Sequence, residues 1–102
     1  MTKRSETAAL LFFTSSRSGP ARRMDSLLAQ LARKERGRLR VVTVDADACA
    51  LLAEAFGVGE VPTLVLMRDG RPVARIEGRA SGSEIDAMIR QHLPDPSDAR
   101  AA

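Results

Sequence analysis

The sequence predicts an α/β fold in which three helices flank a central four-stranded mixed sheet. Short apolar runs, typical of strands, alternate with segments whose apolar residues recur every three or four positions, typical of helices. Glycine, proline and aspartate separate these segments. The expected order is strand, helix, strand, helix, strand, strand, helix, in one domain at 8–93. Residues 1–7 are expected to form a flexible N-terminal tail, and residues 94–102 a disordered C-terminal tail.

The first strand and the first helix meet at a polar turn. The apolar run at 8–13 indicates a buried strand. Apolar residues then recur at helical spacing from Met24 to Leu31, which predicts a helix at about 18–36 with one apolar face. Pro20 is compatible with the first turn of that helix, because an amide there has no intrahelical partner. A junction of this kind exposes free N–H groups and the positive end of a helix dipole.

The second strand and the second helix follow a glycine at the end of the first helix. β-Branched residues at 39–44 indicate the strand. Strand, helix and strand in this order imply a parallel pair joined by a right-handed crossover. The second helix is expected at about 48–56, capped by Asp45 or Asp47 and closed by Gly57.

A β-hairpin occupies the second half of the predicted sheet. The continuous apolar run at 64–67 indicates a strand that is buried on both faces. Asp69-Gly70 marks a tight turn, and the segment 72–77 continues as an edge strand, where a proline is tolerated.

The last helix has a clear start and stop in the sequence. Ser81 and Glu84 have the spacing of a capping box, and Ser83 is an alternative cap. Apolar residues from Ile85 to Leu93 form its core face, and Pro94 ends it.

The composition excludes several classes of protein. With 102 residues, 44% hydrophobic and 28% charged, the chain resembles an ordinary globular domain. No apolar run approaches the ~20 residues that span a bilayer, and the run at 8–13 is too short for a signal sequence. We therefore expect a cytoplasmic protein without membrane contact. The net charge is +3, the arginines are scattered, and tryptophan and tyrosine are absent, so a nucleic-acid partner is not expected.

Cys49 is the only cysteine. It excludes an internal disulfide and a multi-cysteine metal site, and we expect neither a metal nor a cofactor. We expect Cys49 to be a small, partly buried hydrophobe at the start of the second helix, and the alternative is a modifiable thiol.

The strand–helix junction carries Ser18-Gly19-Pro20-Ala21. This motif resembles the Cys-Gly-Pro-Cys of the thioredoxin family, with both cysteines replaced. Val61-Pro62-Thr63 is similar to the family's Ile/Val-Pro-Thr with its cis proline, and the Asp69-Gly70 turn and Gly78 follow in the family's order and spacing. The resemblance covers residues 8–93 and implies a thioredoxin-like fold. It also implies that the N-terminal strand and helix of many thioredoxins are missing before this core, which leaves a sheet edge and part of one face without their usual cover.

The same resemblance implies that the redox apparatus is lost. Ser18 stands at the position of the attacking cysteine, and Ala21 at that of the resolving cysteine. Phe12 matches a buried aspartate that acts as a proton relay in the family, and Thr43 matches its lysine partner. Arg17 replaces the aromatic residue before the first cysteine. A serine hydroxyl stays protonated at neutral pH and does not exchange with disulfides, so no catalytic residue is expected.

A binding surface can persist without sulfur. In the family, the backbone beside the cis proline pairs with an extended client segment. The resemblance therefore implies a groove formed by Arg17, Ser18, Gly19, Pro20, Ala21, Val61 and Pro62. The alternative is that these residues are only scaffold. The helix start also has three basic side chains that could hold an anion, namely Arg17, Arg22 and Arg23. The alternative is that these side chains face solvent.

These observations favour a redox-inactive, chaperone-like binding module for a protein client or partner subunit, with self-association as a further option. The alternative is a thiol-disulfide oxidoreductase or a glutathione-dependent thioredoxin-family enzyme of cell redox homeostasis. A serine nucleophile at Ser18 would need a base, and the only histidine, His92, ends the last helix.

Overall fold

The structure, a computed structural model, describes residues 8–93. The tails that the sequence predicts at 1–7 and 94–102 lie outside the described residues. The elements are β1 (Ala8–Thr14), α1 (Gly19–Arg23), α2 (Asp25–Lys34), β2 (Leu39–Asp45), α3 (Ala50–Ala55), β3 (Thr63–Arg68), β4 (Arg71–Glu77) and α4 (Gly82–His92). The predicted α/β class and the order of its elements are confirmed, with the first predicted helix divided into α1 and α2.

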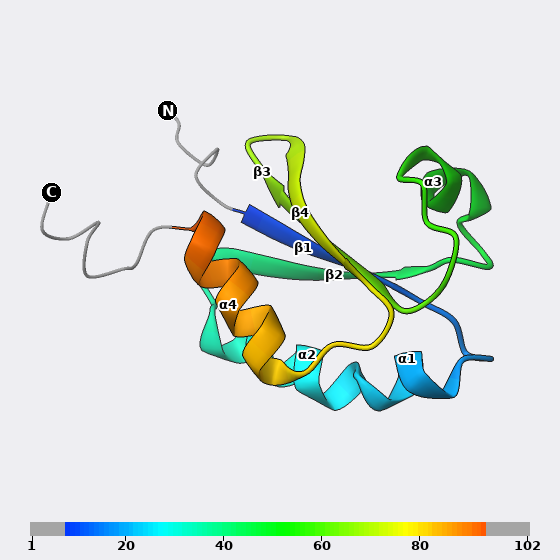
Figure 1. The fold of residues 1–102 in the computed structure, drawn as a ribbon, viewed down its shortest axis with the longest axis horizontal. Helices are drawn as coiled ribbons and strands as arrows, with labels where there is room; N and C mark the ends of the chain where they lie inside the picture. The colour runs from blue at the N-terminus through cyan, green and yellow to red at the C-terminus, as the bar shows by residue number, and fades with distance from the viewer. Residues whose placement is uncertain (1–7, 94–102) are drawn as a thin grey trace, which may run out of the picture.

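The strands form one mixed sheet in the order β2-β1-β3-β4 (Figure 1). β1 runs parallel to β2 and antiparallel to β3, and β3 runs antiparallel to β4. In the register, Phe13 in β1 lies opposite Thr63, the first residue of β3. The carboxyl ends of β1 and β2 therefore meet the amino end of β3 at one end of the sheet. The turn after β1, the loop after β2 and the loop before β3 all converge there.

One face of the sheet is closed by α2 and α4, which lie together on that side (Figure 1). Side chains of β1 and β3 pack there against the apolar sides of both helices. The largest fully buried members of this core are Leu10, Phe12, Leu64, Leu66, Ile85 and Ile89. Alternate residues of each strand point to this face, as the pleat of a strand requires.

Among the described residues, α3 is the one helix on the opposite face, at the end of the sheet where the loops converge (Figure 1). Phe13 packs there with Val44 and Ala53, and its ring lies 5.8 Å from that of Phe56. Farther along the face, several apolar side chains are only partly buried, among them Leu11, Val42 and Met67. The second core is therefore smaller than the first.

Two local predictions agree with the structure. Asp69 and Gly70 both have positive φ, 55° and 80°, as a tight hairpin turn requires. The capping box of α4 is formed: Glu84 N–H donates to Ser81 Oγ at 3.1 Å, and Ser81 N–H donates to Glu84 Oε1 at 2.7 Å. Ser81 is therefore the cap, and the alternative cap at Ser83 is wrong.

The first helix is interrupted at Met24. Its N–H donates to the carbonyl of Ala21 at 3.1 Å, a reach of three residues where an α-helix uses four. Helical bonding resumes with the N–H of Leu28, which donates to the carbonyl of Met24 at 2.9 Å. The expected single helix at 18–36 is therefore two shorter helices, α1 and α2.

The second helix is shorter than the predicted 48–56 and is not capped by an aspartate. Cys49 occupies its N-cap position and makes no side-chain cap hydrogen bond. Asp45 Oδ1 accepts from the N–H groups of Asp47 and Ala48, and so stabilises the turn before α3. The capping prediction for Asp45 and Asp47 is therefore wrong.

Candidate functional site

The turn between β1 and α1 is held by serine side chains and backbone. Ser18 N–H donates to the carbonyl of Ser15 at 3.0 Å, and Arg17 N–H donates to Ser15 Oγ at 3.2 Å. Ser18 is the N-cap of α1, and its Oγ accepts from Ala21 N–H at 3.2 Å. The methyl group of Ala21 is fully buried. The hydroxyl of Ser18 thus has a structural partner in the helix that it begins.

The loop before β3 reaches the same end of the sheet. The Val61-Pro62 peptide bond is cis, and the carbonyl of Pro62 accepts from Gly78 N–H at 2.8 Å. Thr63 Oγ1 donates to the carbonyl of Glu60 at 2.7 Å. No hydrogen bond from residues 8–93 reaches the N–H or the C=O of Val61. An unpaired stretch of backbone therefore lies beside the end of β1.

Asp47 lies in the loop after β2, and its carboxylate accepts hydrogen bonds from the turn after β1. Ser15 Oγ donates to Asp47 Oδ2 at 2.6 Å, although 32 positions separate the two residues in the chain. The guanidinium of Arg17 donates to Asp47 Oδ1 at 3.1 Å. Ser15 is almost fully buried, so this contact satisfies a polar group that is largely shielded from water.

These contacts favour the charged form of the carboxyl group. The hydrogen bond from Ser15 and then the hydrogen bond and charge of Arg17 hold the pKa of Asp47 below its ordinary value of 3.8. Asp47 therefore remains a carboxylate at neutral pH and keeps both hydrogen bonds.

The comparisons with known proteins decide the family. A family model described as Thioredoxin matches residues 1–91. The chain belongs to the thioredoxin family. It is 28% identical over 88 residues to thioredoxin C-2 of Corynebacterium nephridii, covering 86% of this chain and 82% of that protein. It is 29% identical over 89 residues to the thioredoxin of Haemophilus influenzae, covering 87% and 83%.

Solved thioredoxin structures have the same fold. Thioredoxin NaTrxh of Nicotiana alata superposes with a TM-score of 0.80 at 26% identity, covering 86% of this chain and 75% of that one. A mutant thioredoxin of Halobacterium salinarum gives 0.80 at 29% identity, covering 88% and 78%. The thioredoxin-like fold implied by the motifs is thus confirmed.

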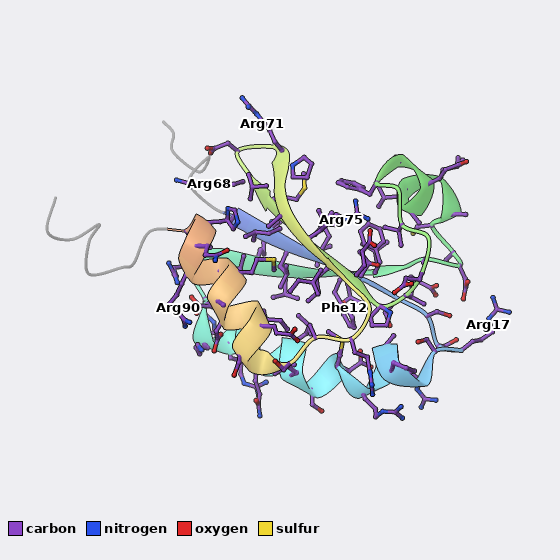
Figure 2. The ribbon with its side chains drawn as sticks, in the orientation of Figure 1. Phe12, Arg17, Arg68, Arg71, Arg75 and Arg90 are labelled. Carbon is purple, nitrogen blue, oxygen red and sulfur yellow. The ribbon has the colours of Figure 1, made fainter. Side chains whose placement is uncertain are left out.

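The positions that the resemblance assigns to the thioredoxin proton relay are neighbours in the sheet. Phe12 in β1 lies opposite Thr43 in β2. Phe12 is 1% exposed and lies between the sheet and the helices, as Figure 2 shows. A phenyl ring and a hydroxyl therefore occupy the places of the family's carboxyl group and amine.

The arginines near α1 do not all converge on the helix start. The guanidinium of Arg17 binds Asp47, and its side chain extends away from the core (Figure 2). Arg22 and Arg23 are exposed, and the guanidinium of Arg23 passes close to Gly19. The anion site at these arginines stays a prediction.

The remaining candidates lie apart from the motif. Cys49 is exposed at the start of α3, so the expectation of a partly buried side chain is wrong. His92 is the last residue of α4, and its carbonyl accepts from Arg68 Nη1 at 2.7 Å.

Ser15 and the bonded role of Asp47 were not predicted from the motifs. The positions of Ser15 and Asp47 relative to the predicted strands could have indicated that the two residues lie close together. Each follows one of two parallel neighbouring strands within two positions, and the carboxyl ends of such strands lie side by side.

Two further properties concern residues 8–93 only. No group of three or more His, Cys, Asp and Glu side chains is placed there to hold a metal ion. None of the helices in this part of the chain has the length and apolarity needed to cross a membrane.

Proposed function

We propose that this thioredoxin-family chain is a redox-inactive binding module that holds an extended segment of a protein partner. The groove consists of the turn at Arg17–Ala21 and the loop at Val61-Pro62. The unpaired backbone of Val61 is the observation that carries the proposal. An extended segment can pair with such a backbone as an added strand, with no need for a thiol.

The arrangement of the motif argues against dithiol exchange. Exchange needs a thiolate that attacks and a second thiol that resolves the mixed disulfide. Ser18 Oγ instead caps α1, and Ala21 presents a buried methyl group. Phe12 fills the position of the family's relay carboxyl group with a buried ring. The positions of the thiols and of the relay are therefore taken by groups that do not ionise at neutral pH.

The topology supports binding at Val61. The first residue of β3 pairs with Phe13, so Val61 lies next to the turn that follows β1. The bonds to Gly78 and within the Glu60–Thr63 segment hold the loop on either side of Val61. A loop fixed in this way loses little conformational entropy when it binds.

The exposed thiol of Cys49 favours one alternative function. The thiolate of a cysteine that solvent reaches can attack a disulfide, including oxidised glutathione, forming a mixed disulfide and releasing the other sulfur as a thiolate. In this alternative, Cys49 would work without a resolving partner, since it is the only cysteine.

Insulin reduction driven by dithiothreitol separates the two functions. We expect no rate above that of dithiothreitol alone, for the wild-type chain and for Cys49→Ala. A wild-type rate that Cys49→Ala abolishes would establish the alternative. The double variant Ser18→Cys with Ala21→Cys should gain a dithiol that oxidises to a disulfide, because the helix start lowers the pKa of an attacking thiol.

Binding is tested with a reduced and alkylated protein chain, which is extended and free of thiols. In NMR titrations, the amide signals of Val61 and of the Ser18–Ala21 turn should shift. Gly19→Phe should weaken this binding, because its ring would cover the exposed turn, whereas Ser26→Phe on the exposed side of α2 should not. Equal binding by both variants, or shifts confined to other surfaces, would contradict the groove.

A further inference from the structure

An open depression of about 380 Å³ lies beside Val61, between α3 and the loop before β3. This volume is more than ten times the ~30 Å³ that a water molecule takes in the liquid. Its apolar lining consists of Ala46, Ala50, Ala53, Val58 and Val61. Acidic residues complete the lining: Asp47, Glu54 and Glu60. An apolar floor and an acidic rim therefore adjoin the backbone at which the partner segment is proposed to bind.

The negative charge of this rim is only partly neutralised. Asp47 is bound by Ser15 and Arg17. Glu54 and Glu60 are exposed, and neither carboxylate has a hydrogen bond or an ion pair within residues 8–93. The whole chain, by contrast, has a net charge of +3. The rim is thus a local acidic surface on a basic protein.

Arg75, which reaches the same loop from β4, does not neutralise the rim. Its guanidinium donates to the carbonyls of Phe56 and Gly57 at 2.8 and 3.3 Å and pairs with Glu77 at 3.2 Å. Its donors are therefore directed at the loop backbone and at a nearby residue of its own strand.

We infer that this depression receives a lysine or arginine side chain of the segment that pairs with Val61, an inference that rests on the proposed function. Lysine and arginine lay their aliphatic stems on apolar surface and keep the charged head in water. The alanine and valine side chains of the depression can pack against the aliphatic stem, and Glu54 and Glu60 can pair with the charged group. Alternate side chains of an added strand point to the same side, so one of them can enter the depression while the backbone pairs.

A compact metal ion fits the rim less well than a long cationic side chain. The carboxylates do not form a group of metal ligands within residues 8–93. An ammonium or guanidinium group needs only one or two acceptors at hydrogen-bond distance and adjusts its position along a flexible stem. The partner chemistry is therefore a basic residue in an extended peptide.

Selection from a displayed library of random peptides tests the inference. Peptides enriched on the wild-type chain should carry lysine or arginine at one fixed position. The enrichment at that position should disappear on Glu54→Gln/Glu60→Gln, which keeps the shape of both side chains. It should persist on the matched control Asp69→Asn/Asp86→Asn, which removes the same charge from residues outside the lining of the depression.

Titration of a selected peptide then measures the contribution of the charge. Replacing its basic residue by norleucine should weaken binding about threefold to fivefold, as expected for an exposed ion pair, and glutamate should weaken it more. The norleucine peptide should bind the wild type and Glu54→Gln/Glu60→Gln equally. Added salt should reduce the difference between the lysine and norleucine peptides.

The outcomes separate this inference from the proposed function. If no peptide is enriched, or if Gly19→Phe leaves the binding of enriched peptides intact, the groove itself is wrong. If Gly19→Phe weakens binding but the enriched peptides are neutral or acidic, the groove stands and the basic specificity is overturned. Persistence of the basic preference on Glu54→Gln/Glu60→Gln would also overturn it.

Discussion

On one face of the sheet, α2 and α4 cover a continuous apolar core, whereas on the other face α3 covers only the end where the loops converge. The first face holds Phe12, at the position where the thioredoxin resemblance implies a carboxyl group. The second face borders the polar contacts of Ser15 with Asp47 and the acidic depression. Helices therefore cover the first face along its length, whereas the second face has a smaller core with polar groups beside it. Substitutions in the first core should therefore have the largest effects on stability, and substitutions at the loop end should change recognition and have smaller effects on stability.

The largest effect is expected from Phe12→Asp. The variant removes a buried ring and leaves a carboxylate among apolar side chains, so the free energy of unfolding should fall by about 4 kcal/mol or more. Denaturant titration at neutral pH measures it. Phe12→Leu, the apolar control, should lose only about 1–1.5 kcal/mol. A stable Phe12→Asp variant would mean that this face accepts the family's charged relay after all.

Two adjacent leucines of β1 give the sharpest measure of the difference between the faces. Leu10 is fully buried on the α2 and α4 face, whereas Leu11 is partly buried on the α3 face. Leu10→Ala should lower the free energy of unfolding by about 3–5 kcal/mol, and Leu11→Ala by about 1–2 kcal/mol. Equal losses in denaturant titrations would show that the second face is packed as tightly as the first.

A smaller, pH-dependent effect is expected from Asp47→Asn. A carboxyl group whose pKa is lowered by folding stabilises the protein above its ordinary pKa and loses this contribution as the pH falls through the lowered value. The wild type should therefore unfold at a higher temperature than Asp47→Asn at neutral pH, and the difference should shrink below pH 3.8.

Thermal unfolding followed by circular dichroism at several pH values measures this effect. Asp69→Asn serves as control, since the carboxylate of Asp69 has no hydrogen bond or ion pair within residues 8–93. A difference between the wild type and Asp47→Asn that stays constant with pH would contradict the role given to Ser15 and Arg17.

The fold was predictable from the sequence because its signals are local. The apolar periods, the Asp69-Gly70 turn and the Ser81 cap each depend on a few neighbouring residues. The break at Met24 was not predicted, because no proline or glycine marks it and it consists of one changed hydrogen bond. The contact of Ser15 with Asp47 was missed because it joins residues 32 positions apart. The acidic depression was missed although its lining lies between Ala46 and Val61, because it depends on how α3 and the loop before β3 lie against each other.

The loop that presents Val61 is held at one end by the edge strand β4 and at the other by Gly78, the residue that follows β4. Arg75 binds the carbonyls at its beginning, and Gly78 N–H binds the carbonyl of Pro62 at its end. Figure 2 shows Arg75 on β4. The outer side of β4 has no neighbouring strand among the described residues. A second molecule that paired with β4 there would therefore contact the strand that carries Arg75, one of the two residues that hold this loop.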